Sequence, residues 1–239
     1  TSLYRYAAFD DPNYSAYGIS NDQIKWQFKY NAGYEHAFFG DYKTSIQLFG
    51  QTIAGRPFSY TMTEAATDST GRSPSFGTIL NTSNYLMYVP TGPDDPKVVY
   101  DSDTTKQQLD DYINNSVLSK YRGQVAPRNI DTSKSRTRLD LHFEQEIPTF
   151  VGRSRISLFA DVYNFLNLLN SKWGISEQVA FPQNVSLVKV QCLDGSGHPS
   201  TTSTACVTYK YSANSATGIA KPNQSLTTPV TNSLYLIRI

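Results

Sequence analysis

The 239-residue sequence lacks the features that mark several common protein classes. Lysine and arginine number 21 and aspartate and glutamate number 20, so the net charge of +1 gives no electrostatic argument for binding nucleic acid or an anionic membrane surface. No run approaches the ~18 consecutive apolar residues of a membrane helix. This excludes a helical membrane protein but leaves a membrane barrel open, because barrel strands are only half apolar. No signal peptide opens the chain, and both ends interrupt strand-like patterns, so we expect a fragment of a longer protein.

Residues that would support catalysis or hold a cofactor are also scarce. His36, His142 and His198 fall on different expected elements, and no Ser-His-Asp, Cys-His or phosphate-loop arrangement occurs. We therefore expect no enzyme and no cofactor. Cys192 and Cys206 predict a disulfide and an oxidising compartment, with a pair of free thiols as the alternative. A zinc site is excluded because no further ligands stand at suitable spacing.

The composition favours β-structure. Aromatic residues make up 13% of the chain, including 17 tyrosines, and charged residues only 17%. Such a composition is typical of strands and suits a protein with interfacial aromatic rings, although a soluble β-sandwich accommodates it as well.

Residues 24–54 predict a long antiparallel hairpin. Apolar and polar residues alternate strictly over 24–36, the sequence FFGD at 38–41 supplies a turn, and the return strand runs over 42–54. Each strand is about 13 residues long and would rise roughly 30 Å when tilted, whereas ordinary strands have ~5–6 residues. Strands of this length match a lipid hydrocarbon layer better than a small sandwich.

A second hairpin is expected at 135–147 and 155–166. One side of its first strand is apolar and the other is charged, and the charged residues are candidates for a barrel lumen: Arg136, Arg138, Asp140, His142, Glu144 and Glu146. They would line a ligand path or contact a plug, or form a plain solvated wall. In the return strand Leu158 and Ala160 share a side, but Phe159 and Tyr163 lie opposite, so its outer face is left unassigned.

The connections between these strands are very unequal. Two short turns contrast with segments 55–132 and 167–231, far longer than the ~15 residues that compact domains leave unstructured. Membrane barrels have short periplasmic turns and long extracellular loops. We therefore predict an all-β fold, a transmembrane antiparallel β-barrel segment of about six strands with long extracellular loops and one short loop helix. The strands are expected near 2–9, 24–36, 42–54, 135–147, 155–166 and 233–239.

The long segments are expected to hold structure of their own. Leu109, Tyr112 and Ile113 stand at helical spacing within 102–121, and Ser102 or Asp103 can cap that helix. Residues 184–192 and 205–213 predict a small hairpin tied by the two cysteines, and 84–90 predicts another short strand.

Four segments, in order, resemble the C-terminal barrel of TonB-dependent outer-membrane receptors: YVPTGPDDPKVVY (88–100), LSKYRGQVAPRN (118–129), TRLDLHFEQEIP (137–148) and LFADVYNFLNLLNSKWG (158–174). They are most similar to the Oar-like branch, whose members carry a carboxypeptidase-regulatory-like domain. The resemblance implies that 1–239 is the C-terminal part of a barrel of about 22 strands in the bacterial outer membrane. It implies four partners: the protein's own N-terminal plug, the remaining barrel strands, the TonB complex of the inner membrane, and outer-membrane lipid. Such receptors usually end on an aromatic residue, so an end at Ile239 implies a few missing residues.

Aromatic side chains on the apolar face predict contact with lipid. Tyr34 and Tyr42 flank the short turn, where an inner aromatic belt belongs, and Trp26 lies near the outer end. The candidate lipid-facing residues are Trp26, Phe28, Tyr30, Tyr34, Tyr42, Leu139, Leu141 and Phe143. The alternative is the core stripe of a soluble sheet, which requires a second layer that the polar long segments are poorly suited to supply.

Two further groups of polar residues were weighed as sites. One holds hard oxygen ligands suited to calcium, but turn and cap roles are the favoured explanation because no spacing matches a known calcium loop: Asp94, Asp95, Asp101, Asp103, Asp110 and Asp111. The other directly precedes strand 135–147 and is expected to connect loop and barrel wall rather than contact a ligand: Arg122, Gln124, Arg128 and Asn129.

Binding and gated passage are therefore expected rather than catalysis. The leading hypothesis is an outer-membrane receptor that binds an external ligand and imports it with TonB-derived energy. An iron-siderophore, an oligosaccharide and a peptide all remain open as ligands. The alternative from another class is a secreted β-rich adhesin or carbohydrate-binding module, which would be soluble without detergent, and a passive porin is a third hypothesis.

Overall fold

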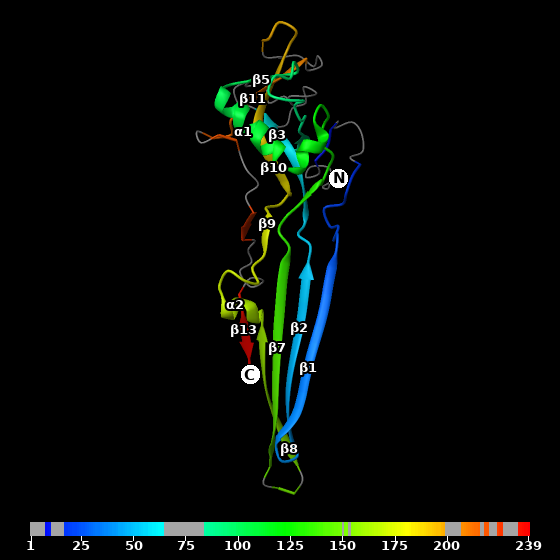
Figure 1. The fold of residues 1–239 in the computed structure, drawn as a ribbon, viewed down its shortest axis with the longest axis vertical. Coiled ribbons are helices and arrows are strands. Elements are labelled where there is room, and N and C mark those ends of the chain that lie inside the picture. Colours follow the sequence, from blue (N-terminus) through cyan, green and yellow to red (C-terminus); the bar gives the residue numbers. More distant parts are fainter. Residues whose placement is uncertain are drawn as a thin grey trace. The chain divides into compact units, whose positions relative to one another are not determined.

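The computed structural model describes residues 8–10, 17–64, 84–149, 151–152, 154–198, 207–215, 218–219, 224–226 and 234–239. These residues are mostly β-sheet with few helices, which confirms the predicted all-β class at that level (Figure 1). The chain divides into two compact units that alternate along the sequence. Unit 1 comprises Thr1–Gln23, Arg56–Thr132 and Val179–Asn223, and unit 2 comprises Ile24–Gly55, Ser133–Gln178 and Gln224–Ile239.

Unit 2 is built on a five-stranded antiparallel sheet with the order β1-β2-β7-β8-β13. The strands are β1 (Gln27–Phe39), β2 (Tyr42–Ile53), β7 (Arg136–Pro148), β8 (Arg155–Tyr163) and β13 (Leu236–Arg238). Four of them have 9 to 13 residues, well above the ~5–6 of ordinary strands. Each overlaps a range in which the sequence predicts a strand.

Pairing register aligns the apolar sides of these strands. Tyr34 lies opposite Ile46, Ile46 opposite Phe143, and Phe143 opposite Ala160. Because side chains alternate between the two faces of a strand, four strands share one continuous apolar face. The side of β8 that faces this way, left unassigned from the sequence, is therefore the one with Leu158 and Ala160.

The structure differs from the predicted strands at two places. Strand β8 ends at Tyr163 rather than 166, because Asn164 adopts a left-handed backbone with φ of 53° and a short helix α2 (Phe165–Leu169) follows. Residues 1–7 of the expected strand 2–9 lie outside the described residues, and Phe9 bridges Tyr85 in unit 1. The sheet formed by the described residues has five strands.

Unit 1 is a sheet of its own, formed from the two long segments that were expected to be loops. Its order is β4-β3-β10-β11-β5, with β6 also paired to β3. The strands are β3 (Pro57–Glu64), β4 (Tyr85–Leu86), β5 (Val98–Tyr100), β6 (Asp131–Thr132), β10 (Asn184–Leu193) and β11 (Thr208–Ser212). The pair β10–β11 is the predicted hairpin, but β3 with β10 and β5 with β11 pair in parallel. The sequence does not reveal these parallel pairs, because their partners come from segments far apart in the chain.

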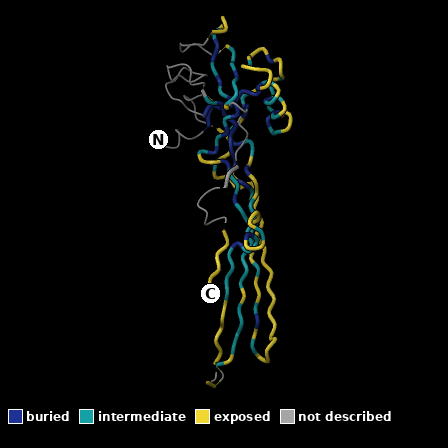
Figure 2. The backbone as a smooth tube through the Cα atoms, turned by 90° about the vertical axis from the view of Figure 1, so that its left-hand side faces the viewer, coloured by how far each residue is buried: buried dark blue, intermediate teal, exposed yellow. Residues whose placement is uncertain are grey.

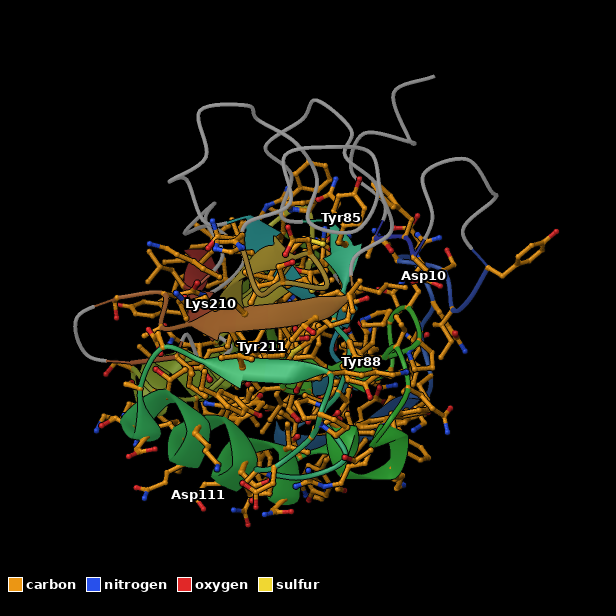
Figure 3. All side chains as sticks on the ribbon, turned by 90° about the horizontal axis from the view of Figure 1, so that it is seen from above. Asp10, Tyr85, Tyr88, Asp111, Lys210 and Tyr211 are labelled. Atoms are coloured by element: carbon orange, nitrogen blue, oxygen red, sulfur yellow. The ribbon has the colours of Figure 1, made fainter. Side chains whose placement is uncertain are left out.

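The core of unit 1 lies between this sheet and helix α1 (Asp103–Asn114), the predicted loop helix. Ser102 caps α1 by accepting a hydrogen bond from the Thr105 amide at 3.2 Å. Leu109 and Ile113 on the inner side of α1 are 0% and 1% exposed. Figure 3 shows Tyr88 and Tyr211 within the unit and Asp111 on the outer side of α1. Unit 1 thus buries a hydrophobic core in the manner of a water-soluble domain.

The remaining described elements are small. A 3₁₀ turn, η1 (Val117–Tyr121), follows α1, and β9 (Glu177–Val179) pairs with β12 (Gln224–Leu226) in a two-stranded sheet. No helix within the described ranges is long and apolar enough to span a bilayer.

Candidate functional site

The apolar face of the unit 2 sheet remains exposed. Phe28 is 64% exposed, Tyr34 55% and Leu158 57%, whereas the largest buried side chains belong to unit 1. Figure 2 shows the same contrast, with exposed and intermediate residues along the long strands. The described candidates for lipid contact all lie on these strands or at their ends, and Trp26, Phe28, Tyr30, Tyr34 and Phe143 are among the exposed large hydrophobic residues. A contiguous exposed apolar face of this kind marks an interaction surface in soluble proteins or a lipid contact in membrane proteins.

Aromatic rings lie in two groups along this face of β1. The rings of Trp26 and Phe28 lie 5.6 Å apart, and the His36 ring lies 6.2 Å from Tyr34 and 4.6 Å from Phe38. Tyr42, at the start of β2, is covered by the Arg155 guanidinium at 5.6 Å from its ring centre. Aromatic side chains are thus present at both ends of the sheet, as an aromatic belt requires.

The opposite face of the sheet is charged. The six residues predicted for a lumen lie on it together, because they occupy alternate positions of β7: Arg136, Arg138, Asp140, His142, Glu144 and Glu146. His142 Nδ1 lies 2.6 Å from Asp161 and its Nε2 lies 3.7 Å from Glu144. The remaining pairs are Arg138 with Asp140 at 2.8 Å and Glu146 with Arg155 at 2.7 Å. Most of the row is therefore paired, either within β7 or with residues of β8.

An ion-pair network joins the two short turns at one end of this face. Glu146 Oε2 accepts hydrogen bonds from the Lys43 amide at 3.0 Å and from Arg155 at 2.7 Å. Arg155 also donates to the Asp41 carbonyl at 3.0 Å, and Lys43 Nζ lies 2.5 Å from Glu35. The network holds strands β1, β2, β7 and β8 in one register at this end.

Sequence analysis missed several of these partners. Glu35, Lys43, Arg155 and Asp161 were not among the candidates, although each contacts the charged face. The signal for them is the register, which places Asp161 opposite His142, Lys43 diagonal to Glu35, and Arg155 diagonal to Glu146. The alternation in the sequence left the faces of β8 ambiguous, so its residues were not placed.

The segment after β8 is fixed by asparagine side chains. The backbone N–H of Asn164 donates to Asp140 Oδ1 at 2.8 Å, and the side-chain Nδ2 of Asn164 donates to the Gly174 carbonyl at 3.1 Å. Asn167 Nδ2 donates to the carbonyls of Ser171 and Trp173 at 3.1 and 3.0 Å. These bonds close α2 into a compact loop, so the asparagines of the YNFLNLLN run have a structural role here.

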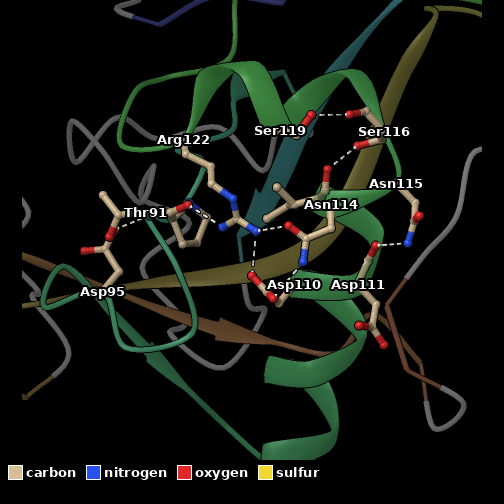
Figure 4. Close-up of polar contacts among 11 residues, drawn as sticks. Thr91, Asp95, Asp110, Asp111, Asn114, Asn115, Ser116, Ser119 and Arg122 are labelled. Carbon is tan, nitrogen blue, oxygen red and sulfur yellow. Dashed lines mark hydrogen bonds and ion pairs between the residues drawn. The ribbon is translucent and has the colours of Figure 1, made fainter.

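The motif residues 122–129 make their contacts within unit 1. Arg122 donates to the Pro90 carbonyl at 3.1 Å and to Asp110 and Asn114, each at 2.7 Å (Figure 4). The Gln124 carbonyl accepts from the Val89 amide at 2.9 Å. Arg128 and Asn129 both donate to Asn21, at 2.9 and 2.7 Å. These contacts hold the loops of unit 1 together.

The aspartates weighed as a calcium site serve separate structural partners. Asp94 pairs with Lys106 at 2.6 Å, and Asp110 pairs with Arg122. Asp101 accepts from the Ala213 amide at 3.1 Å, and Asp103 begins α1. No group of three His, Cys, Asp or Glu residues in the described part of the chain is arranged to hold a metal ion.

Asp95 is the buried member of this group, at 4% exposed. Its carboxylate accepts from the Thr91 amide at 2.7 Å, the Lys97 amide at 2.8 Å and the Tyr88 hydroxyl at 3.0 Å. Burial acts to raise the pKa of the Asp95 carboxyl, but these hydrogen bonds outweigh it and hold that pKa below its ordinary value. Burial, together with the contact to Asp95, raises the pKa of Tyr88 to about 12. Asp95 is thus a structural anchor of the loop before β5.

Cys192 lies in β10 and is disulfide-bonded. The other cysteine of the sequence, Cys206, lies outside the described residues.

Comparisons of the chain with protein-family models, with curated proteins and with solved structures return no match.

Proposed function

We propose that this chain forms part of the wall of a transmembrane β-barrel in the bacterial outer membrane and acts as part of a TonB-dependent receptor and transporter. The uncovered apolar face of long antiparallel strands supports this proposal most directly. Leaving a large apolar side chain in water instead of burying it forgoes about 1.5–3 kcal/mol. Contact with lipid recovers this free energy across the whole face.

The arrangement of polar groups supports the same function. The charged face of β7 is suited to line a water-filled lumen, and the short turns all lie at one end of the sheet, as periplasmic turns do. Unit 1, formed by the two long segments, would provide the external ligand-binding part. The mechanism is binding and gated passage, with the plug and the TonB complex as partners, and the ligand is a siderophore, an oligosaccharide or a peptide.

One observation favours a second candidate function. Unit 1 has a hydrophobic core of its own, as a secreted adhesin or carbohydrate-binding module would. That alternative leaves the exposed face of unit 2 without a covering layer, so we rank it second.

Tryptophan fluorescence in lipid tests the proposal. The sequence has two tryptophans, Trp26 and Trp173, so Trp173→Phe leaves Trp26 as the single reporter on the apolar face. After reconstitution of this variant into phosphatidylcholine vesicles, we expect strong quenching of Trp26 by bromine-labelled acyl chains. The Trp26→Phe variant, which retains Trp173 beyond the end of β8, is the matched control and should be quenched less.

The competing function makes the opposite prediction. A protein that stays monomeric in detergent-free buffer, with Trp26 unquenched in the presence of vesicles, is a soluble module and not a barrel wall.

A further inference from the structure

A hollow of about 320 Å³ opens on the charged face of the unit 2 sheet. It lies towards the end of the sheet that is remote from the short turns, where β1 begins, β2 ends and β7 begins. Its lining residues are Lys29, Phe49, Gly50, Gln51, Arg136, Arg138 and Asp140.

Three cations from two strands converge on this hollow. Lys29 lies opposite Gln51, and Gln51 lies opposite Arg138, so these three side chains form one cross-strand row. Arg136 stands two residues before Arg138 and therefore on the same face. With Asp140 as the one carboxylate in the lining, the charges +3 and −1 sum to +2.

The one carboxylate of the hollow is already engaged. Asp140 Oδ1 accepts hydrogen bonds from Arg138 Nε and from the Asn164 amide, both at 2.8 Å. The Arg138 guanidinium is further held over the Tyr163 ring, 5.8 Å from its centre. In the described part of the chain, neither the Lys29 ammonium nor the Arg136 guanidinium has a hydrogen bond or an ion pair. Their donors are available to another group.

The positive charges of this hollow outnumber its negative charges, so the hollow carries uncompensated positive charge. Like charges on the same face of a sheet repel each other, and the repulsion is strongest where side chains are partly removed from water, as those of Arg136 and Arg138 on β7 are. An anion bound among these cations would be attracted to each of them and would offset their mutual repulsion. Because the sheet fixes the backbone positions of the three residues and Arg138 is held by Asp140, the ordering needed when an anion binds is confined to the side chains of Lys29 and Arg136. A guanidinium and an ammonium together suit a carboxylate or a phosphate, whose oxygens accept several charge-assisted hydrogen bonds.

We propose that this hollow is a subsite for an anionic group, a carboxylate or a phosphate, of the ligand. The inference deepens the proposed function and rests on it, because the hollow lies on a ligand path only if the charged face lines a passage. A plain solvated wall is a poorer account, because the other charged residues of β7 are paired whereas, among the described residues, Arg136 and Lys29 at this end are not.

Binding of small anions to the intact protein in detergent tests the subsite. The probes are inorganic phosphate and citrate, titrated separately and followed by calorimetry at low ionic strength. Charge-assisted hydrogen bonds contribute ~1.5–3 kcal/mol, so we expect Arg136→Gln to weaken binding roughly tenfold to hundredfold. Lys172→Gln removes the same charge from an exposed position of unit 2 outside the hollow and should leave the affinity unchanged.

Each result decides the question. Binding of phosphate alone or of citrate alone supports the subsite and identifies the group, and Lys29→Gln should then weaken the same probe if Arg136→Gln fails to fold. Absence of binding by both probes, or equal weakening by Arg136→Gln and Lys172→Gln, overturns the subsite. Quenching of Trp26 after reconstitution into vesicles separates the two proposals: quenching without anion binding refutes the subsite alone, and absence of quenching refutes the barrel.

Discussion

At the scale of single residues, Asp95 shows how a charge is used inside unit 1. Its neighbour Asp94 has a side chain that is 90% exposed and pairs with Lys106, whereas Asp95 is buried and accepts three hydrogen bonds from the loop before β5. Breaking a buried, charge-assisted network costs far more than losing an exposed ion pair. Two adjacent aspartates therefore differ sharply in what they contribute to folding.

We predict that Asp95→Asn lowers the stability of unit 1 by about 1–3 kcal/mol at neutral pH, since the amide replaces one acceptor with a donor. The effect depends on pH. The pKa of Asp95 in the folded protein lies below the ~3.9 of an unfolded aspartate. The ionised carboxylate therefore contributes fully to the stability of unit 1 at pH values well above ~3.9, and this contribution is lost as the pH falls through the folded-state pKa. Amide hydrogen exchange of β5 and β11 measures both effects, and the difference between wild type and variant should shrink below about pH 4.

Asp94→Asn is the control and should change the exchange of these strands little at any pH. An equal loss of protection in both variants would contradict the anchoring role of Asp95.

At the scale of elements, a glycine and a tyrosine are matched across the β1–β2 pair. Tyr30 lies opposite Gly50, and its ring occupies the space that a side chain at Gly50 would need, since a Cβ there would stand 1.8 Å from Tyr30 Cε2. A ring lying over a cross-strand glycine covers exposed backbone and helps to fix the register of the two strands.

Gly50→Ala should therefore displace the Tyr30 ring and destabilise the sheet by about 1–3 kcal/mol. Gly33→Ala, in the same pair of strands, is the control, because a Cβ there meets Gln47 Cγ at an ordinary 3.7 Å. Thermal unfolding in detergent measures the difference. In a Tyr30→Ala background Gly50→Ala should become nearly neutral, and a persistent loss there would show that the ring is not the cause.

At the scale of the whole molecule, the question is what covers the apolar face of unit 2. Ile46 lies on this face in the middle of β2, is 37% exposed, and is followed by Gln47 on the charged face. The free-energy cost of a new charge on this face depends on whether the face contacts lipid or water. A soluble sheet tolerates an arginine at an exposed position, whereas a bilayer penalises it by ~2–4 kcal/mol near its midplane.

Ile46→Arg should therefore reduce the fraction of protein that inserts into vesicles or reaches the outer membrane, while Gln47→Arg should insert as the wild type does. Flotation of vesicles on a density gradient measures the inserted fraction. Equal insertion of both variants, or improved solubility of Ile46→Arg without any loss elsewhere, would argue against lipid contact.

Local patterns in the sequence were sufficient to predict the elements of unit 2. Strict alternation and two short turns predicted the strands β1, β2 and β7 to within a few residues, because the period of a strand and the chemistry of a turn act between neighbours in the chain. The same holds for α1, whose apolar spacing and Ser102 cap are local features. The end of β8 was mispredicted because the left-handed Asn164 is held there by Asp140, a contact with another strand.

The sequence alone therefore determined the all-β fold class, the long two-faced strands, the single row of charges on β7 and the helix α1. Only the tertiary structure decided that the two long segments build one mixed sheet with parallel pairs, that Arg122 and Asp95 serve unit 1, and that Lys29 meets Arg136 and Arg138 around one hollow. The physical reason is distance along the chain. Periodicity and turns are encoded by adjacent residues, whereas parallel pairing and the balance of charge across strands depend on which remote segments the fold brings together.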